Sequence, residues 1–282
     1  MAENKTTPFS TSHLRGRFSD FVSRQWAISD TLLGAMKERG WQAFAFGGTP
    51  RGVVARGAHY QPRDLDLVFD DAHFTEFARL FHHCIRRRNR FGGLQLRIDH
   101  AMVDAWPLSS TWAFKEGLVR DISFPNLPRT TFLNVDGLVI EFTSRAGQKR
   151  ELHEAGFQHA WDSRLLDINL RDNPYPALCV VRTLQLARQF RLRIARPLTF
   201  YLYDQFQTLG EAELRETQRA HYGFEVFSHG ALRTLRQQVE QQCERAPLFP
   251  LDLFPGQMRL RFGRRHDLPL GSVAAFSVES EE

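Results

Sequence analysis

The stretch FAFGGTPRGVVARGAHYQPRDLDLVFDD, residues 44–71, decides the fold of this chain. It begins in a short apolar segment, residues 42–46, which is typical of a strand and runs directly into two glycines. It closes with residues 65–69, where apolar and acidic side chains alternate as they do on a strand. The order strand, glycine turn, helix, strand is therefore predicted for this stretch.

Two acidic side chains, Asp64 and Asp66, are separated by one residue on the second of these strands. Because side chains alternate across a strand, both carboxylates project from the same face. Two like charges held together are costly unless a cation lies between them, and a hard divalent ion such as Mg²⁺ accepts oxygen ligands readily. Asp104, alone in the apolar segment 101–105, would complete a site for two Mg²⁺ ions. An exposed strand face is the alternative explanation of such a pair.

The two glycines precede a predicted helix in the segment Gly47-Gly48-Thr49-Pro50-Arg51. Free backbone N–H groups and a helix N-terminus in this arrangement bind phosphate groups. We therefore expect Gly47, Gly48 and Thr49 to hold the β- and γ-phosphates of a nucleotide, with help from Arg51. An ordinary glycine turn is the alternative, but it leaves unexplained why an arginine and a carboxylate pair follow within twenty residues.

The remaining sequence predicts an α+β head followed by helices. A helix is expected within residues 18–40, an amphipathic helix over 74–85 with Arg86, Arg87 and Arg88 at its end, and strands at 94–98, 101–105 and 138–142. Strand signals then disappear. The predicted organisation is a flexible N-terminus (1–17), a head with a mixed sheet (18–145), an all-α neck or cap (146–245) and a Pro/Arg-rich segment with an acidic tail (246–282).

The quoted stretch resembles the polymerase-beta-like nucleotidyltransferases, and within them the head and neck of bacterial poly(A) polymerases and CCA-adding enzymes of the class II type. The resemblance rests on Gly47, Gly48 and Arg51, followed by Asp64 and Asp66, and it implies that the two aspartates are metal ligands. Gly52 stands where that branch usually has an acidic residue.

Two later segments extend the resemblance, which covers about residues 42–200. LPRTTFLNVDGLVIEF, residues 127–142, resembles a degenerate copy of a second motif, and it implies that Arg129 and Asn134 contact the nucleotide. LRDNPYPALCVVRTLQLARQFRLRI, residues 170–194, resembles the start of the neck, in which acidic and arginine side chains read the incoming base. The matching positions here are Asp172, Arg182 and Arg188.

Together these features predict an enzyme that transfers a nucleoside monophosphate from ATP or another NTP to an acceptor hydroxyl and releases pyrophosphate. Two Mg²⁺ ions would be held by Asp64, Asp66 and Asp104. The 3′ end of an RNA resembling tRNA is the favoured acceptor; a protein, a small molecule or a second nucleotide is the alternative. A non-catalytic nucleotide- or RNA-binding module on the same fold is the rival from a different functional class.

Composition sets limits on these hypotheses. The chain has 282 residues and a net charge of +5, and only four of its 37 basic residues are lysines. The arginine bias favours a polyanionic partner, because a guanidinium binds phosphate in a bidentate manner, although a GC-rich genome also explains it. No apolar run reaches the length of a bilayer span and the N-terminus lacks a signal-peptide core, so we expect a cytoplasmic protein without membrane contact.

Overall fold

The computed structural model describes residues 10–24, 29–143, 148–245 and 249–255. In this part of the chain seven strands form one sheet in the order β3-β4-β5-β2-β1-β6-β7. Their bounds are β1 Ala43–Ala45, β2 Asp64–Phe69, β3 Ile85–Arg88, β4 Leu94–Ile98, β5 Ala101–Pro107, β6 Leu138–Glu141 and β7 Leu152–Glu154. β2 and β5 are parallel and the other neighbours are antiparallel, so the expected mixed sheet is confirmed.

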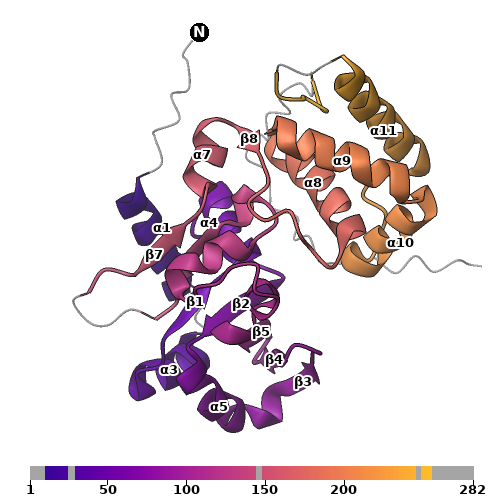
Figure 1. The fold of residues 1–282 in the computed structure, drawn as a ribbon. Coiled ribbons are helices and arrows are strands. Elements are labelled where there is room, and N and C mark those ends of the chain that lie inside the picture. Colours follow the sequence, from indigo (N-terminus) through magenta and orange to yellow (C-terminus); the bar gives the residue numbers. More distant parts are fainter. Residues whose placement is uncertain (1–9, 25–28, 144–147, 246–248, 256–282) are drawn as a thin grey trace, which may run out of the picture.

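Helices cover the sheet and then form a separate group (Figure 1). Those of the head are α1 Thr11–Arg24, α3 Gly34–Arg39, α4 Gly48–Arg56, α5 Asp71–Leu80, α6 Trp112–Lys115 and α7 Phe157–Asp162. Short helical turns are η1 Ser29–Leu33 (a π-helix), η2 His82–Cys84, η3 Leu108–Ser110, η4 Phe124–Thr130 and η5 Asn134–Asp136. The C-terminal group comprises α8 Pro176–Phe190, α9 Arg196–Thr208, α10 Glu211–Tyr222 and α11 His229–Glu244.

The strand β2 divides its side chains between two environments. Leu65, Leu67 and Phe69 enter a core that also contains α1, α3 and α5, and the rings of Phe69 and Phe77 stack there with centroids 4.3 Å apart. Asp64 and Asp66 project from the other face, where the sheet is only partly covered. The alternation in the sequence therefore places the two carboxylates on the open face of the sheet.

Local signals explain where the neighbouring elements start. The side chain of Asp70 accepts a hydrogen bond from the backbone N–H of Ala72 and caps α5. Pro176 begins α8, at a position where its missing N–H costs no helical hydrogen bond. The cap at Asp70 therefore marks the end of β2, and Pro176 marks the start of the helical group.

The amphipathic helix predicted over residues 74–85 is shorter than expected. α5 ends at Leu80, and Ile85–Arg88 form β3, the edge strand of the sheet. Arg86, Arg87 and Arg88 therefore lie on a strand and not at a helix end, which corrects the prediction. The spacing of the apolar residues Phe81, Cys84 and Ile85 fits a helix, but it fits equally well the turn η2 that leads into an edge strand. The spacing alone therefore could not show that the helix ends at Leu80.

Three further differences concern the ends of the two parts. α1 begins at Thr11, inside the segment expected to be a loose lead-in, and its Leu14 is buried. Strands do not disappear after residue 150, because β7 joins the sheet and the short strands β8 (Leu165–Leu166) and β9 (Arg193–Ile194) pair in parallel. In the predicted Pro/Arg-rich segment, Leu251 forms an antiparallel bridge with Ile194. Residues 256–282, which include the expected acidic tail, lie outside the described residues.

The helical group has its own apolar core, and that core reaches into the head. Side chains of α8, α9, α10 and α11 pack together, and Phe132, Leu133 and Val135 from the segment before β6 pack with them. The head and the helical group are thus joined by shared packing as well as by the chain. In the described residues we find no helix long and apolar enough to cross a membrane.

Candidate active site

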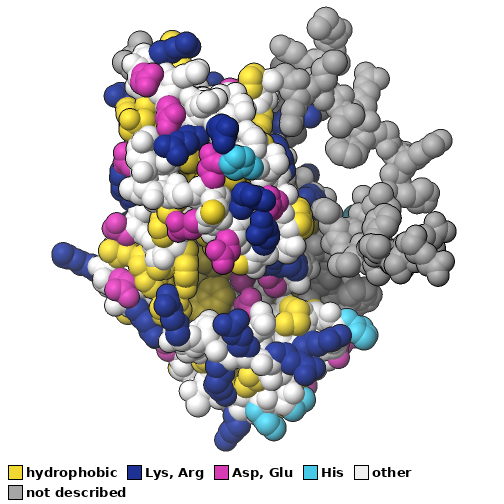
Figure 2. Space-filling view, turned by 90° about the vertical axis from the view of Figure 1, so that its right-hand side faces the viewer, with side chains coloured by type: hydrophobic (Ala, Val, Ile, Leu, Met, Phe, Trp, Pro, Cys, Tyr) yellow, Lys and Arg dark blue, Asp and Glu magenta, His cyan; other side chains and the backbone are white. Residues whose placement is uncertain are grey.

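A cavity of about 370 Å³ lies between the open face of the sheet and the helix α8. The head contributes the end of β1, the start of α4, Asp66 and the segments 111–113 and 130–136, and the helical group contributes residues 173–182. Figure 2 shows the hollow from outside, with hydrophobic side chains in its floor and Lys and Arg side chains on both sides of it. The cavity is therefore built by both parts of the molecule.

Backbone groups form one wall of the cavity where β1 passes into α4. Gly47 has φ +63° and ψ −118°, and a Cβ atom added to it would lie 3.3 Å from Oδ2 of Asp66. Gly47 and Gly48 both line the cavity, and no side chain caps the N-terminus of α4. The first N–H groups of the nine-residue helix α4 are thus available to an anion beside Asp66.

Three carboxylates converge on the sheet face next to this helix N-terminus. Asp64 and Asp66 are two residues apart on β2, and Asp66 lies directly opposite Asp104 in the parallel ladder between β2 and β5. Burial, and then the charges of Asp64 and Asp104, raise the pKa of Asp66 to about 8. Burial also raises the pKa of Asp104, against a hydrogen bond from Gln95 that lowers it. The fold thus holds these acids close enough to destabilise one another's charged forms.

This donor set fits a hard divalent cation. Carboxylate oxygens are the ligands that Mg²⁺ prefers, and a cation would relieve the repulsion that raises the pKa of Asp66. The described His, Cys, Asp and Glu side chains contain no ready-made metal cluster of three. Asp64 instead accepts hydrogen bonds at 2.8 and 3.1 Å from Arg63. Asp64 would have to exchange that arginine for the cation, so its role as a ligand stays a prediction.

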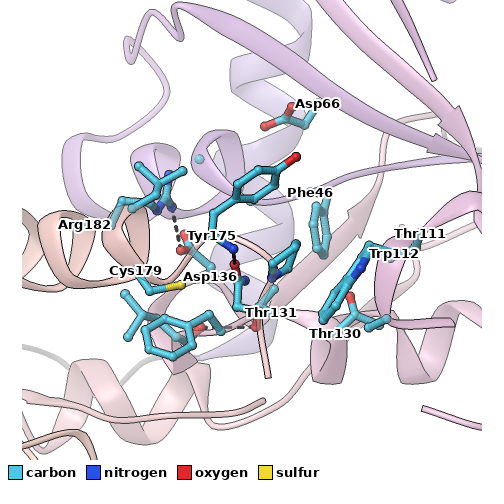
Figure 3. A pocket seen from close by; sticks show the side chains of 18 of the residues that line it. Phe46, Asp66, Thr111, Trp112, Thr130, Thr131, Asp136, Tyr175, Cys179 and Arg182 are labelled. Atoms are coloured by element: carbon cyan, nitrogen blue, oxygen red, sulfur yellow. Dashed lines mark hydrogen bonds and ion pairs between the residues drawn. The ribbon is translucent and has the colours of Figure 1, made fainter. Parts of the chain in front are cut away.

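Arg51 and Arg182 share one counter-charge, Asp136, at the base of the cavity. The side chain of Arg51 is 13% exposed and pairs with Oδ1 of Asp136, and Arg182 donates to Oδ2 at 2.7 Å (Figure 3). Burial, and next the charge of Arg182, lower the pKa of Arg51 to about 9, which still leaves it protonated at neutral pH. Arg182 lines the cavity whereas Arg51 does not. The three residues connect α4, η5 and α8.

Aromatic side chains form the other walls. The rings of Phe46 and Trp106 meet edge to face with centroids 5.9 Å apart, and Trp106 donates through Nε1 to Oγ1 of Thr111 at 3.1 Å. Trp112 and Tyr175 also line the cavity, and Figure 3 shows Phe46 and Tyr175 in the region between Asp66 and Asp136. Flat π-faces of this kind bind nucleobases of any sequence by stacking.

Several residues expected at the nucleotide lie elsewhere. Thr49 is buried and donates to the backbone carbonyl of Asp64 at 3.4 Å, so it ties α4 to β2. Asn134 is buried, donates to the carbonyl of Leu165 and accepts from the N–H of Asp167. Arg129 and Asp172 are exposed and do not line the cavity.

Arg188, the last of the neck positions, also has a structural partner. It donates to the carbonyl of Val226 at 3.3 Å and lies over the ring of Phe227 at 4.4 Å. The structure therefore brings Gly47, Gly48, Asp66 and Arg182 to one cavity, with Asp104 at its border on the sheet. It leaves Thr49, Arg129, Asn134 and Asp172 outside it.

A local contact accounts for the glycine at position 52, where the resembled motif has an acidic residue. A Cβ atom added to Gly52 would lie 2.1 Å from Cε1 of Tyr60, so the tyrosine ring occupies the place of a side chain at position 52. The ring belongs to the loop between α4 and β2, and Arg56 lies 5.7 Å from its centroid. The residue that departs from the resembled motif therefore lies on the buried side of α4, where the Tyr60 ring leaves no room for a side chain.

Sequence reasoning missed Asp136, Phe46, Tyr175 and Thr131 among the residues that line the cavity. Asp136 had a usable signal, since it is a single acidic residue in an otherwise apolar segment, as Asp104 is. The aromatic residues had none, because an aromatic residue near the end of a strand more often belongs to the core. Only the tertiary fold brings residue 46 and residue 175 to the same cavity.

Comparisons with known proteins agree with this fold. A CCA-adding enzyme in complex with CTP is 14% identical to the chain, with a TM-score of 0.54, and the match covers 78% of this chain and 54% of that one. The Thermotoga maritima CCA-adding enzyme complexed with tRNA_CCA is 13% identical, with a TM-score of 0.52, and the match covers 84% and 60% of the two chains. A CCA-adding enzyme complexed with ATP is 14% identical, with a TM-score of 0.50, covering 82% and 51%.

These likenesses confirm the expected fold: an α+β head followed by helices, as in CCA-adding enzymes. No protein-family model matches the chain, and no curated protein matches it. The chain spans between about half and 60% of the length of the three structures named.

Proposed function

We propose that the chain is a Mg²⁺-dependent nucleotidyltransferase that transfers a nucleoside monophosphate from an NTP to the 3′-hydroxyl of an RNA. One observation carries this proposal. The carboxylates Asp66 and Asp104 and the free N-terminus of α4 meet at the border of one cavity that aromatic side chains also line. Likeness in fold to enzymes bound to CTP, ATP and tRNA supports it. We expect this activity in the cytoplasm.

The residues of the chain would divide the work as follows. The N–H groups at the start of α4, beside Gly47 and Gly48, would bind the β- and γ-phosphates and stabilise the charge of the leaving pyrophosphate. Phe46, Trp112 and Tyr175 would stack on the base. Arg182, held in place by Asp136, would present its remaining donors to the base or the ribose.

Asp64, Asp66 and Asp104 would hold the Mg²⁺. The bound metal supplies charge neutralisation for the triphosphate and a lowered pKa for the attacking hydroxyl. A bond then forms between that hydroxyl oxygen and the α-phosphorus, the bond to pyrophosphate breaks in line, and the hydroxyl proton passes to solvent or to a carboxylate. Asp104 lies on the side of Asp66 away from α4, and the acceptor hydroxyl would bind there.

The proposal is tested with the full chain, Mg²⁺, each α-labelled NTP in turn and a ten-nucleotide single-stranded RNA. Wild type should add label to the RNA, and Asp66→Asn should reduce the rate at least about 100-fold, because one metal ligand is lost while the shape is kept. Asp20→Asn, which removes one charge from an exposed position on α1, is the matched control and should keep full activity.

The other outcomes identify what must replace the proposal. Label that enters a protein or a small molecule while the RNA stays unlabelled would refute the RNA acceptor and retain nucleotidyl transfer. Nucleotide binding without any pyrophosphate release by wild type would refute the enzyme and favour the binding module. Full activity of Asp66→Asn would refute the metal site.

A further inference from the structure

A row of polar side chains crosses the open face of the sheet, and it continues beyond the carboxylates to an arginine. Asp66 on β2 lies opposite Asp104 on β5, Asp104 opposite Gln95 on β4, and Gln95 opposite Arg87 on β3. Directly opposite residues project from the same face of a sheet. The four side chains line a second hollow of about 310 Å³ that shares Asp66 and Trp106 with the nucleotide cavity.

The position of Arg87 in this row depends on an irregularity of the edge strand. Ile85 pairs with Leu96, and in a regular antiparallel ladder Arg86 would follow opposite Gln95. The register instead shifts by one residue, so that Arg87 lies opposite Gln95 and Arg88 opposite the buried Leu94. β-Bulges commonly turn a side chain toward a functional site. Here the bulge turns Arg87 into the hollow that contains Asp104.

Arg87 differs in its partners from the arginines beside the nucleotide cavity and beside Asp64. Arg51 and Arg182 are paired with Asp136, and Arg63 is paired with Asp64. No described carboxylate forms an ion pair with Arg87. An arginine that lines a hollow without a counter-charge is suited to an anion from outside, and its guanidinium fork matches the geometry of a phosphate group.

The spacing of the row matches one nucleotide. Adjacent strands are about 4.8 Å apart, so Arg87 lies roughly 10 Å along the row from Asp104. A nucleotide whose 3′-hydroxyl lies at Asp104 carries its own 5′-phosphate away from the reacting centre. The long side chain of Arg87 can reach back along the row towards that phosphate.

We infer that Arg87 binds the last internucleotide phosphate of the acceptor, and that the acceptor is therefore a polynucleotide strand. The inference rests on the proposed function, because it takes the acceptor hydroxyl to lie at Asp66 and Asp104. Arg87 is a binding residue in this arrangement and takes no part in the bond changes.

The test uses equilibrium binding, so it does not depend on turnover. A fluorescein-labelled ten-nucleotide single-stranded RNA is titrated with the full chain in Mg²⁺, and the same RNA is made with a neutral methylphosphonate as its last linkage. Arg87→Ala should raise the Kd for the ordinary RNA about fivefold to tenfold. It should also reduce the slope of log K against log salt by about 0.7, the value for one phosphate contact on a single strand.

Two comparisons make the test specific to one phosphate. The neutral linkage should weaken binding to wild type by a similar factor and should cause no further loss in Arg87→Ala, because both changes remove the same contact. Arg88→Ala removes the same charge from the neighbouring position, on the other face of the strand, and should change the Kd less than twofold. Both positions are exposed, so both variants should fold.

Three results would overturn the inference: an unchanged Kd for Arg87→Ala, an equal effect of Arg88→Ala, or a further loss in Arg87→Ala on the neutral linkage. Label transfer to the ordinary RNA is measured on the same samples. Transfer without dependence on Arg87 would reject the phosphate site and retain the enzyme. Dependence on Arg87 without transfer by wild type would retain the phosphate site and reject the proposed reaction.

Discussion

At the scale of single residues, the site depends on a glycine that no other residue can replace without strain. Gly47 combines a positive φ with close approach to the carboxylate of Asp66, so its lack of a side chain serves both the turn and the space around the metal ligand. The spacing of Asp64 and Asp66 was enough to predict their shared face. Nothing in the sequence indicated that the carboxylate of Asp66 would lie in close contact with the glycine turn.

Gly47→Ala should destabilise the protein by about 1–3 kcal/mol and should lower NTP binding, because the new Cβ needs a disfavoured backbone conformation beside Oδ2 of Asp66. Urea denaturation gives the change in unfolding free energy, and nucleotide titration gives the affinity. Gly34→Ala, in α3 with no heavy atom within 4 Å of the added Cβ, is the control and should be neutral or slightly stabilising. Equal stability of the two variants would contradict the role of Gly47.

At the scale of elements, periodicity predicted β2, β4, β5 and β6 close to their observed positions, and α4 begins at the two glycines after which a helix was expected. It could not predict which strands are neighbours, because the parallel pairing of β2 and β5 joins residues about forty positions apart. That pairing is what places Asp104 beside Asp66. The edge strand β3 was also missed, since its arginines fitted a helix end equally well and only the sheet decides between the two.

The link between α4, η5 and α8 predicts a large effect at Asp136. Asp136→Ala leaves the mostly buried Arg51 and the half-buried Arg182 without their counter-charge, which should lower the unfolding free energy by about 3 kcal/mol. Chemical denaturation measures this loss. Asp172→Ala, at an exposed position ahead of α8, removes a carboxylate of the same kind and should change stability by less than about 0.5 kcal/mol. A loss at Asp136 no greater than this would show that the two arginines need no shared partner.

At the scale of the whole molecule, the two-part organisation was predicted from the change of pattern near residue 150, and the border proved less sharp than expected. The helical core takes in Phe132, Leu133 and Val135, which precede the last strands of the head. Contacts also cross the border elsewhere: Arg90 donates to the hydroxyl of Tyr175, and Arg63 to the carbonyl of His221. No local pattern encodes such contacts between distant segments.

His221 on α10 lies where the helical group meets the head, and its surroundings should make the stability of the protein sensitive to acid. Burial, and then the charges of Arg182 and Arg63, lower the pKa of His221 to about 4, against a weaker opposite effect of Asp64. The unfolded chain protonates this residue near pH 6.5. The folded protein binds that proton less well, so the contribution of His221 to stability is complete above pH 6.5 and is lost as the pH falls towards 4.

Thermal unfolding at pH values from 7.5 to 4 checks this prediction. The Tm of wild type should fall over this range, and His221→Gln should reduce the fall by a few degrees, at about 2–4 °C per kcal/mol for a chain of this size. His100→Gln, at an exposed position, provides the comparison. The same acid dependence in wild type and His221→Gln would show that other groups cause the loss.

The aromatic walls give the cavity an optical property of its own. Of the five tryptophans in the chain, Trp26 lies outside the described residues. Trp106 and Trp112 line the cavity, Trp41 is buried behind the sheet, and Trp161 packs with Phe157 and Phe190. A nucleobase that stacks against Trp106 and Trp112 would quench their emission and leave that of Trp41 and Trp161 as a constant background. The arrival and departure of a nucleotide can therefore be timed by intrinsic fluorescence, without any label attached to the protein or to the ligand.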